Sequence, residues 1–356
     1  MKEKLRVIVF GVGFGQFYLR ALEKVKSKYE LVGIYSRGSE WSKKWAEKYD
    51  VPLYTDINKI TSDIVDVACV VIKSTVVGGE GSTIAQILLK RGINVIQEHP
   101  VHVDDYINCI KIAKKYNCTY RLNTFYPELL NVRQFVDFSK KLSQKSDIKY
   151  INAECSVHVL FPLVDILGRA LGGLRPWKFE MVNAKSKNSP FCIVYGYIHN
   201  IPVCINIQNQ IEPTNPENSL LLLHKISLYT ECGSLVMVGT NSDVIWEPCM
   251  RKYIAKDGGF HLEVNDNCLN LPVYEEMHNN EGKSFRDMFI NTWPDSIKSL
   301  LEKFYNDIFA GSDSNSDTQF LIAACLAWQE LGQCIGHPDI IHMYYDMPIQ
   351  ISDFSK

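Results

Sequence analysis

The sequence predicts a two-domain α/β protein, in which a doubly wound parallel sheet comes first and an α+β domain with a large open, mainly antiparallel sheet follows. Two observations predict this fold class. In the first third of the chain, short apolar β-rich runs alternate with helical stretches, which is typical of βαβ units on a parallel sheet. From about Tyr150 the β-rich runs lengthen and partly alternate, which is typical of an antiparallel sheet with one covered and one open face.

The first domain is expected to cover residues 1–125. Its β-rich runs lack strict alternation, because helices cover both faces of such a sheet. The predicted strands are Leu5–Phe10, Leu31–Tyr35, Val65–Ile72, Asn94–Gln97 and Thr119–Leu122. The predicted helices are Phe17–Lys26, Thr83–Arg91 and Asp105–Lys115.

The second domain is expected to cover residues 126–356. The polar stretches Glu212–Asn218 and Gly311–Asp317 are interpreted as loops within it, and an apolar-rich helix follows the second loop. This domain is predicted to contain the strands Ile151–Val157, Phe191–His199, Val203–Gln208 and Leu220–Tyr229 and the helices Leu160–Leu171 and Phe320–Cys334.

Composition narrows the classes of function. The 38 Lys and Arg residues nearly balance the 40 Asp and Glu residues, and no block of like charge could follow a phosphate backbone or an anionic bilayer. We therefore expect neither nucleic acid nor a membrane as a partner. The 11 cysteines include no CxxC pair, which argues against a disulfide framework and a thiolate zinc site. No apolar segment approaches the roughly 20 residues that span a bilayer, so the cytoplasm is the expected location.

A glycine-rich turn, GVGFGQ at residues 11–16, directly follows the first predicted strand and precedes a helix. Gly11 would make the tight turn, and Gly13 would let a pyrophosphate approach the backbone at the helix N-terminus. The third glycine of GxGxxG is missing, because Gln16 occupies its place and Gly15 precedes it. The strand–turn–helix context, with another strand about 20 residues later, nevertheless predicts a Rossmann dinucleotide-binding domain.

The end of the next predicted strand reads Tyr35-Ser36-Arg37-Gly38-Ser39. Sites for NAD usually place a carboxylate there for the ribose 2′-hydroxyl, whereas an arginine and two serines can bind a 2′-phosphate. NADPH is therefore favoured as the cofactor over NADH, with Lys43 as a further candidate donor. The alternative is a solvated turn with a surface arginine, which Glu40 nearby keeps open.

Polar side chains follow two further predicted strands. Glu98 and His99 follow one strand, and Tyr126 follows the next strand along the chain. Ligands bind beyond the carboxyl ends of the strands in a doubly wound sheet, and adjacent strands lie about 4.8 Å apart. His99 and Tyr126 are therefore expected to line one site. His99 is a candidate proton donor, and Glu98 is its neighbour in the cofactor pocket.

This segment has two other interpretations. His99 can instead cap the turn that Pro100 begins, and spacing alone does not decide between the two roles. A metal site would combine His102 with Asp104 or Asp105, but its third and fourth ligands are not identifiable. No metal is predicted.

Four segments, FGQFYLRAL (14–22), STVVGGEG (74–81), VIQEHPVH (95–102) and NTFYP (123–127), resemble the thiazolinyl imine reductases of siderophore assembly, as in yersiniabactin and pyochelin biosynthesis. Those enzymes belong to the broader glucose-fructose oxidoreductase and inositol dehydrogenase (Gfo/Idh/MocA) family. The resemblance is dense from about residue 14 to residue 127 and rests mainly on architecture beyond.

The sugar dehydrogenases of that family usually carry Glu-Lys-Pro after the fifth strand and a later Asp-x-Gly-x-His. Here His99 stands in place of the lysine, and Arg169 stands where the histidine would fall, although Asp165 is kept. A sugar alcohol needs a base to remove its hydroxyl proton, so sugar oxidation is disfavoured. An imine reductase needs an acid, and the resemblance assigns that role to His99 and Tyr126. Reference acidities favour imidazolium over phenol as donor by about 5 kcal/mol.

The resemblance thus implies NADPH-dependent reduction of a thiazoline C=N bond to a thiazolidine, on an intermediate held as a thioester by a carrier domain of a nonribosomal peptide synthetase. It also implies a homodimer through the open sheet and a C-terminal helix that packs on the first domain. A sugar or polyol dehydrogenase and a catalytically silent NADP-binding sensor are the rival hypotheses. The expected cofactor-binding residues are Gly11, Gly13, Phe14, Gly15, Ser36, Arg37, Ser39, Ser74, Thr75 and Glu98. A helix at Leu160–Leu171 that faces the cleft would place Asp165 or Arg169 near the substrate, although a structural salt bridge between the two is the favoured role.

Overall fold

The protein is described here by a computed structural model. The described residues are 4–74, 79–182, 189–251, 259, 262–263, 267–277, 283–310, 315–342 and 348–355. Among them, the structure has no helix that is both long enough and apolar enough to cross a membrane.

The first domain is built on a six-stranded parallel sheet with the order β3-β2-β1-β4-β5-β6. Its central strands are almost completely buried, as expected when helices cover both faces. The strands are β1 (Leu5–Phe10), β2 (Tyr29–Tyr35), β3 (Leu53–Tyr54), β4 (Val67–Val70), β5 (Asn94–Glu98) and β6 (Tyr120–Asn123). The helices are α1 (Gly15–Glu23), α2 (Glu40–Tyr49), α3 (Gly81–Lys90) and α4 (Val103–Lys115), with a 3₁₀ turn η1 at Ile57–Lys59.

The second domain is built on an eight-stranded sheet with the order β15-β14-β13-β12-β7-β10-β9-β8. All neighbouring strands in it are antiparallel except β7 and β10. The strands are β7 (Tyr150–Ser156), β8 (Trp177–Met181), β9 (Phe191–Ile198), β10 (Ile201–Gln208), β12 (His224–Tyr229), β13 (Gly233–Met237), β14 (Val244–Pro248) and β15 (Glu275–Glu276). The predicted fold class is confirmed.

The helices of the second half are α5 (Leu130–Ser143), α6 (Leu160–Leu171), α7 (Phe285–Asp287), α8 (Trp293–Ala310) and α9 (Asn315–Ile335). Short turns are η2 (Tyr126–Glu128), η3 (Val157–Val159), η4 (Pro216–Asn218), the π-helical η5 (Met288–Thr292) and η6 (Ile351–Ser355), and β11 (Gln210–Ile211) pairs with β16 (Asp339–Ile340).

The large sheet has one covered face and one open face. Val194, Ile205, Ala153 and Ile226 follow one another across four strands and are all buried under the α5 and α6 layer. The residues that alternate with them point to the other side, where Tyr195 is 50% exposed. The alternation seen in the sequence therefore reflects burial on one face alone.

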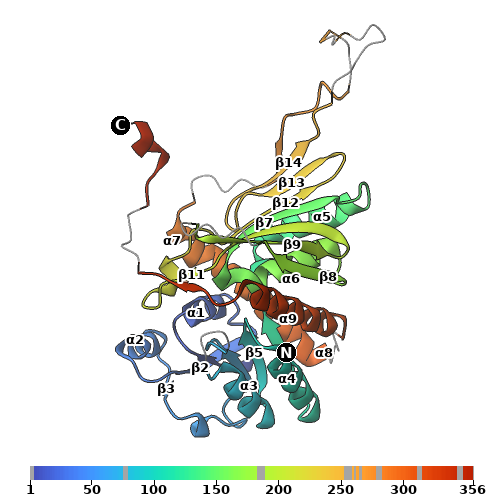
Figure 1. The fold of residues 1–356 in the computed structure, drawn as a ribbon. Helices are drawn as coiled ribbons and strands as arrows, with labels where there is room; N and C mark the ends of the chain where they lie inside the picture. The colour runs from blue at the N-terminus through green and yellow to red at the C-terminus, as the bar shows by residue number, and fades with distance from the viewer. Residues whose placement is uncertain are drawn as a thin grey trace.

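The C-terminal helices connect the two domains. Figure 1 shows the first domain, in blue, below the large sheet, in green and yellow, with the red helix α9 running between them. Helix α9 contacts α4 on one side and α6, β8 and β9 on the other, and α8 packs against α1. The predicted domain boundary at residues 125 and 126 falls between β6 and α5.

The predicted strand at Leu220–Tyr229 is too long, because β12 begins only at His224. The preceding residues are bonded to a side chain instead of a strand: Gln208 Nε2 donates to the Ser219 carbonyl, and Leu221 N donates to Gln208 Oε1. The helix predicted at Phe320–Cys334 starts earlier, at Asn315, so part of the polar stretch before it is helical. Residues 311–314 of that stretch lie outside the described residues.

Candidate active site

The glycine turn adopts a conformation that its residue types explain. Gly11 has φ +85°, and a Cβ there would lie 2.7 Å from the Val71 carbonyl oxygen, so only glycine fits. A Cβ on Gly13 would meet no atom within 4 Å, which leaves open space beside the backbone. A Cβ on Gly15 would lie 3.2 Å from Val9 Cγ1, so this glycine allows the close approach of α1 to β1. Gly15 thus fills the role of the third fingerprint glycine one residue early.

The N-terminus of α1 keeps its backbone donors available. The residue before the helix, Phe14, provides no side-chain cap, whereas Ser39 caps α2 by accepting a hydrogen bond from Ser42 N. An uncapped first turn presents unpaired N–H groups and the positive end of the helix dipole. The Phe14 ring itself packs on Phe125 and Trp293, with ring centroids 5.2 and 5.9 Å away.

The turn after β2 presents one unpaired cation. Arg37 is exposed and makes no hydrogen bond or ion pair with the described part of the chain. Ser36 Oγ accepts a hydrogen bond from Gly38 N, which shapes the turn. Lys43 Nζ, by contrast, forms an ion pair with Glu40 Oε1 at 2.7 Å.

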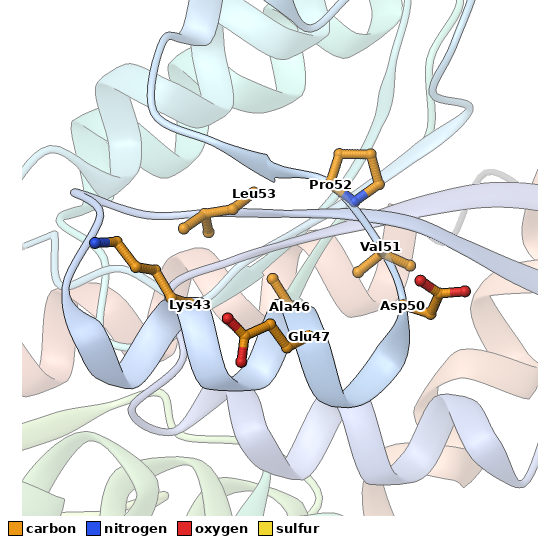
Figure 2. A pocket seen from close by; sticks show the side chains of 7 residues that line it. All are labelled: Lys43, Ala46, Glu47, Asp50, Val51, Pro52 and Leu53. Atoms are coloured by element: carbon orange, nitrogen blue, oxygen red, sulfur yellow. The ribbon is translucent and has the colours of Figure 1, made fainter.

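An open pocket of about 420 Å³ lies between α2 and β3. Figure 2 shows Lys43 and Glu47 on the helix side and Pro52 and Leu53 on the strand side. The residues that line it carry charges of both signs, because Lys43 is basic and Glu47 and Asp50 are acidic. None of the residues that line this pocket belongs to the glycine turn or to the segment around His99, so we do not assign the reaction to it.

His99 is fixed by one ring nitrogen and leaves the other available. Its Nδ1 lies 3.0 Å from the Asn123 carbonyl oxygen and 2.9 Å from Glu98 Oε1. Glu98 Oε1 does not meet hydrogen-bond geometry with any group, so Nδ1–H donates to Asn123 and the carboxylate acts on the ring through its charge. His99 Nε2 has no hydrogen-bond partner among the described residues.

A buried polar network holds Glu98 in place behind the histidine. The Tyr18 hydroxyl, on α1, donates to Glu98 Oε2 at 2.5 Å, and Asn123 Nδ2 lies 2.9 Å from the same oxygen. Burial, and then the charge of Glu98, raise the pKa of Tyr18, so this phenol stays protonated and remains a donor. Helix α1 and strand β6 thus hold Oε2 of the Glu98 carboxylate, while Oε1 faces the His99 ring.

Tyr126 is positioned by a strained turn. Phe125 has φ +57° and ψ −63°, and Tyr126 N donates to the Thr124 carbonyl at 2.7 Å, which is the geometry of a γ-turn that L-residues rarely adopt. Asn123 Oδ1 stabilises the turn by accepting from Phe125 N at 2.9 Å. The Tyr126 and His99 rings face each other edge-on, with centroids 6.0 Å apart. The Tyr126 hydroxyl makes no hydrogen bond within the described ranges and, like Nε2 of His99, is not a buried unpaired atom.

The second domain completes the wall around these two rings. Phe161, on α6, stacks on the His99 ring at 5.8 Å, and His224, on β12, contacts the Tyr126 ring at 5.0 Å. His224 is fully buried between the Thr240 hydroxyl at its Nδ1 and the Val159 carbonyl at its Nε2. Burial lowers the pKa of His224 to about 4, so it is neutral at neutral pH.

The depressed pKa of His224 predicts a loss of stability in acid. The unfolded chain takes up a proton near pH 6.5, whereas the folded protein resists protonation until about pH 4. Stability from this group is therefore present above pH 6.5 and is lost as the pH falls toward 4, by about 2 kcal/mol at pH 5. Urea unfolding at pH 7 and pH 5 checks this. His224→Gln should show a shallower pH dependence, and an unchanged slope would contradict the assignment.

The other predicted site residues are placed as follows. The Ser74 hydroxyl accepts a hydrogen bond from Gln97 Nε2 at 2.9 Å, so it is engaged within the protein, and Thr75 lies outside the described residues. Asp165 and Arg169 form an ion pair of 2.7 Å along α6, and Arg169 extends to Asp317 on α9 at 3.6 Å. In the described segments no cluster of three or more His, Cys, Asp or Glu residues could hold a metal ion, and the 11 cysteines, all within those segments, form no disulfide bond.

Two family models match consecutive parts of the chain. The model of an oxidoreductase family with an NAD-binding Rossmann fold, Gfo/Idh/MocA, matches residues 5–124. The model of the C-terminal domain of Irp3-like thiazolinyl imine reductases matches residues 146–247. Together the matches span more than half of the chain. The first domain of the chain belongs to the Gfo/Idh/MocA family.

Solved structures share this Gfo/Idh/MocA fold over nearly the whole chain. An oxidoreductase from Thermotoga maritima has a TM-score of 0.65 at 13% identity, covering 94% of this chain and 96% of its own. UDP-N-acetylglucosamine 3-dehydrogenase from Acidithiobacillus ferrooxidans has a TM-score of 0.63 at 11% identity, covering 93% and 98%. An oxidoreductase from Agrobacterium radiobacter, solved with NAD⁺, L-tartaric acid and magnesium, has a TM-score of 0.62 at 12% identity, covering 92% and 96%. No curated protein sequence matches the chain.

Because it carries a Gfo/Idh/MocA domain, the protein is an oxidoreductase with a nicotinamide cofactor, and its own residues fit that cofactor. The space beside Gly13 and the uncapped N-terminus of α1 suit a pyrophosphate. The orphaned, buried Oε1 of Glu98 suits a hydroxyl or amide donor, because a buried carboxylate oxygen normally has a partner. The glycine turn and Glu98 are thus residues that would hold a dinucleotide.

Several residues of the site were missed by sequence reasoning. Asn123 and Tyr18 lie inside the segments that resemble the family, so the resemblance could have marked them. Their hydrogen bond to each other joins residues 105 positions apart, which local sequence patterns do not reveal. Phe161 and His224 come from the second domain, where neither spacing nor motif marks them. Only the packing of α6 and β12 against the first domain reveals them.

Proposed function

We propose that the protein is an NADPH-dependent reductase of a cyclic C=N bond, which converts a thiazoline to a thiazolidine on a siderophore intermediate. The intermediate would be held as a thioester by a carrier domain of a nonribosomal peptide synthetase in the cytoplasm. The observation that carries this proposal is a pair of neighbouring rings, His99 and Tyr126, whose Nε2 and hydroxyl make no hydrogen bond with the described residues. They belong to a chain whose second domain matches the thiazolinyl imine reductase model.

The proposed reaction needs one hydride and one proton. NADPH, when bound, supplies the hydride that reaches the imine carbon. His99 delivers the proton from Nε2 to the imine nitrogen, so the C=N bond becomes CH–NH. Because Nδ1–H is held by the Asn123 carbonyl, the acid form carries its extra proton on Nε2, which has no partner among the described residues. Glu98 Oε1 lies 2.9 Å from the same Nδ1 and helps to hold the ring in this orientation.

Tyr126 is the weaker acid of the two. Burial raises the pKa of its phenol above the usual value, and the charges of Glu217 and Glu98 act in the same direction. In reference compounds a phenol is already a weaker proton donor than imidazolium by about 5 kcal/mol, and the raised pKa of Tyr126 makes this phenol weaker still. Tyr126 therefore stays protonated and orients the imine nitrogen as a hydrogen-bond donor, while His99 supplies the proton.

Arg37 is the residue that we expect to select NADPH over NADH. Arg37→Ala should raise the Kd for NADPH by about 10-fold to 100-fold and leave the Kd for NADH unchanged, because a hydrogen-bonded ion pair to the 2′-phosphate is lost. Titration of cofactor fluorescence measures both constants. Lys43→Ala is the matched control, since Glu40 already pairs with that lysine. Equal weakening of both cofactors by Arg37→Ala would contradict the assignment.

Turnover of defined substrates tests the proposed reaction itself. NADPH absorbance is followed with a soluble thiazoline thioester, with a panel of sugars and polyols, and without substrate. We expect oxidation of NADPH only with the thiazoline, together with a product that has gained two hydrogens by mass spectrometry. Turnover of NADP⁺ with sugars alone would favour a sugar dehydrogenase, and no turnover with either would favour a non-catalytic sensor.

The open sheet face is the proposed site of homodimer formation. On this face, Ile193 and Tyr195 of β9 and Tyr229 of β12 are between 38% and 50% exposed. Exposed apolar side chains gathered on one face favour a protein interface. The mass of the protein in solution, measured by light scattering, tests this: a mass of one chain at micromolar concentration would reject the dimer.

A further inference from the structure

His158 lies beside the proposed active site and has no role in the reaction described above. It belongs to η3, the turn between β7 and α6. The residue after it, Val159, accepts the hydrogen bond from His224 Nε2, and Phe161 stacks on the His99 ring. The charge of Glu217 acts on both Tyr126 and His158, which places the two rings in one neighbourhood.

Both ring nitrogens of His158 are buried and have no hydrogen-bond partner in the part of the chain that the structure describes. Most buried side-chain polar atoms in proteins are satisfied, and leaving one unpaired is costly, so two on a single ring require an explanation. The other buried histidine of the site, His224, uses both of its nitrogens. An unsatisfied ring beside an active site fits a group that is kept for a ligand.

The surroundings of His158 indicate what kind of ligand group it meets. Burial lowers the pKa of the His158 imidazole. The charge of Lys73, three residues after β4, lowers this pKa further, while the charge of Glu217 opposes both effects. The ring is therefore neutral at neutral pH and offers one donor and one acceptor nitrogen. A neutral ring between charges of opposite sign suits an uncharged polar group better than an ion.

We propose that His158 is a substrate-positioning residue, which hydrogen-bonds an uncharged polar group on the acyl chain attached to the imine ring. This inference rests on the proposed function, because it presumes a substrate held between the glycine turn, His99 and the η3–α6 segment. His158 contributes to binding and orientation, whereas protonation of the imine nitrogen belongs to His99.

The test separates binding from catalysis and from folding. His158→Leu removes both nitrogens and keeps a side chain of similar size. We expect KM for the thiazoline thioester to rise about 5-fold to 100-fold, kcat to change less than about 3-fold, and the Kd for NADPH to stay unchanged. The Tm of the free variant should be unchanged or higher, because two unpaired buried atoms are gone. His158→Asn, which retains a donor and an acceptor, should recover part of the KM.

The controls keep the inference distinct from the proposed function. His337→Ala removes an exposed imidazole elsewhere and should match the wild type in all four measurements. If the wild type reduces the thiazoline but His158→Leu keeps its KM, the inference is wrong and the proposed function stands. A fall in Tm of several degrees with unchanged KM would assign His158 a structural role. If the wild type fails to reduce the thiazoline, the proposed function falls, and the inference falls with it.

Discussion

His99→Ala should lower turnover of the thiazoline thioester by about 100-fold to 10,000-fold while NADPH binding persists, because the variant lacks the acid that protonates the imine nitrogen. The ring is fixed by the Asn123 carbonyl at Nδ1, so its loss removes a proton donor that is already oriented. Steady-state kinetics with the wild type measure the ratio of kcat values. Cofactor titration of the same samples shows whether the nucleotide site is intact.

His102→Ala provides the matched control for this prediction. His102 lies three positions later on the same segment and is exposed, with its ring near Trp328 instead of the site. We expect its kcat to remain within about 3-fold of the wild-type value. If His99→Ala also keeps the wild-type rate, His99 serves only the turn at Pro100, and the acid must be sought elsewhere, first at Tyr126.

Asn123→Leu should destabilise the protein by about 3 to 5 kcal/mol, since it removes a hydrogen bond to the buried Glu98 carboxylate and leaves the Phe125 N–H without its acceptor. Turnover per folded molecule should fall as well, because the γ-turn that presents Tyr126 loses its support. Urea unfolding without cofactor gives the stability, and kinetics below the transition give the turnover.

Asn94→Leu separates the two effects of that substitution. Asn94 begins β5 at the other end from Glu98, and it too bonds two backbone groups, the Asp66 carbonyl and Thr119 N. We expect this variant to lose stability but to keep wild-type turnover. If Asn123→Leu unfolds within about 1 kcal/mol of the wild type, the polar network does not hold Glu98.

Much of the fold followed from local sequence, because burial of a parallel sheet leaves continuous apolar runs. Strand Leu5–Phe10 and helix Leu160–Leu171 were predicted with the bounds that the structure gives them. A predicted strand boundary was wrong where a side chain takes the place of backbone pairing: the Gln208 side chain bonds the backbone of residues 219 and 221. The short edge strand β3 and helix α2 were not predicted.

The site was predictable only in its first-domain half. His99 and Tyr126 were expected together because parallel strands end at the same edge of a sheet, and the structure places their rings 6.0 Å apart. The groups that confine them, Phe161 and His224, come from a helix and a strand of the other domain. Their positions depend on packing between sheets, which periodicity along one chain does not encode.

The structure of a complex with NADP⁺ and a non-reducible thiazoline analogue tests the central claim most directly. We predict His99 Nε2 within about 2.7 to 3.2 Å of the nitrogen of the analogue ring, with the Tyr126 hydroxyl beside it and the nicotinamide against the ring carbon. An analogue nitrogen that contacts neither side chain, or a His99 ring turned away from the nicotinamide in this closed complex, would contradict the account.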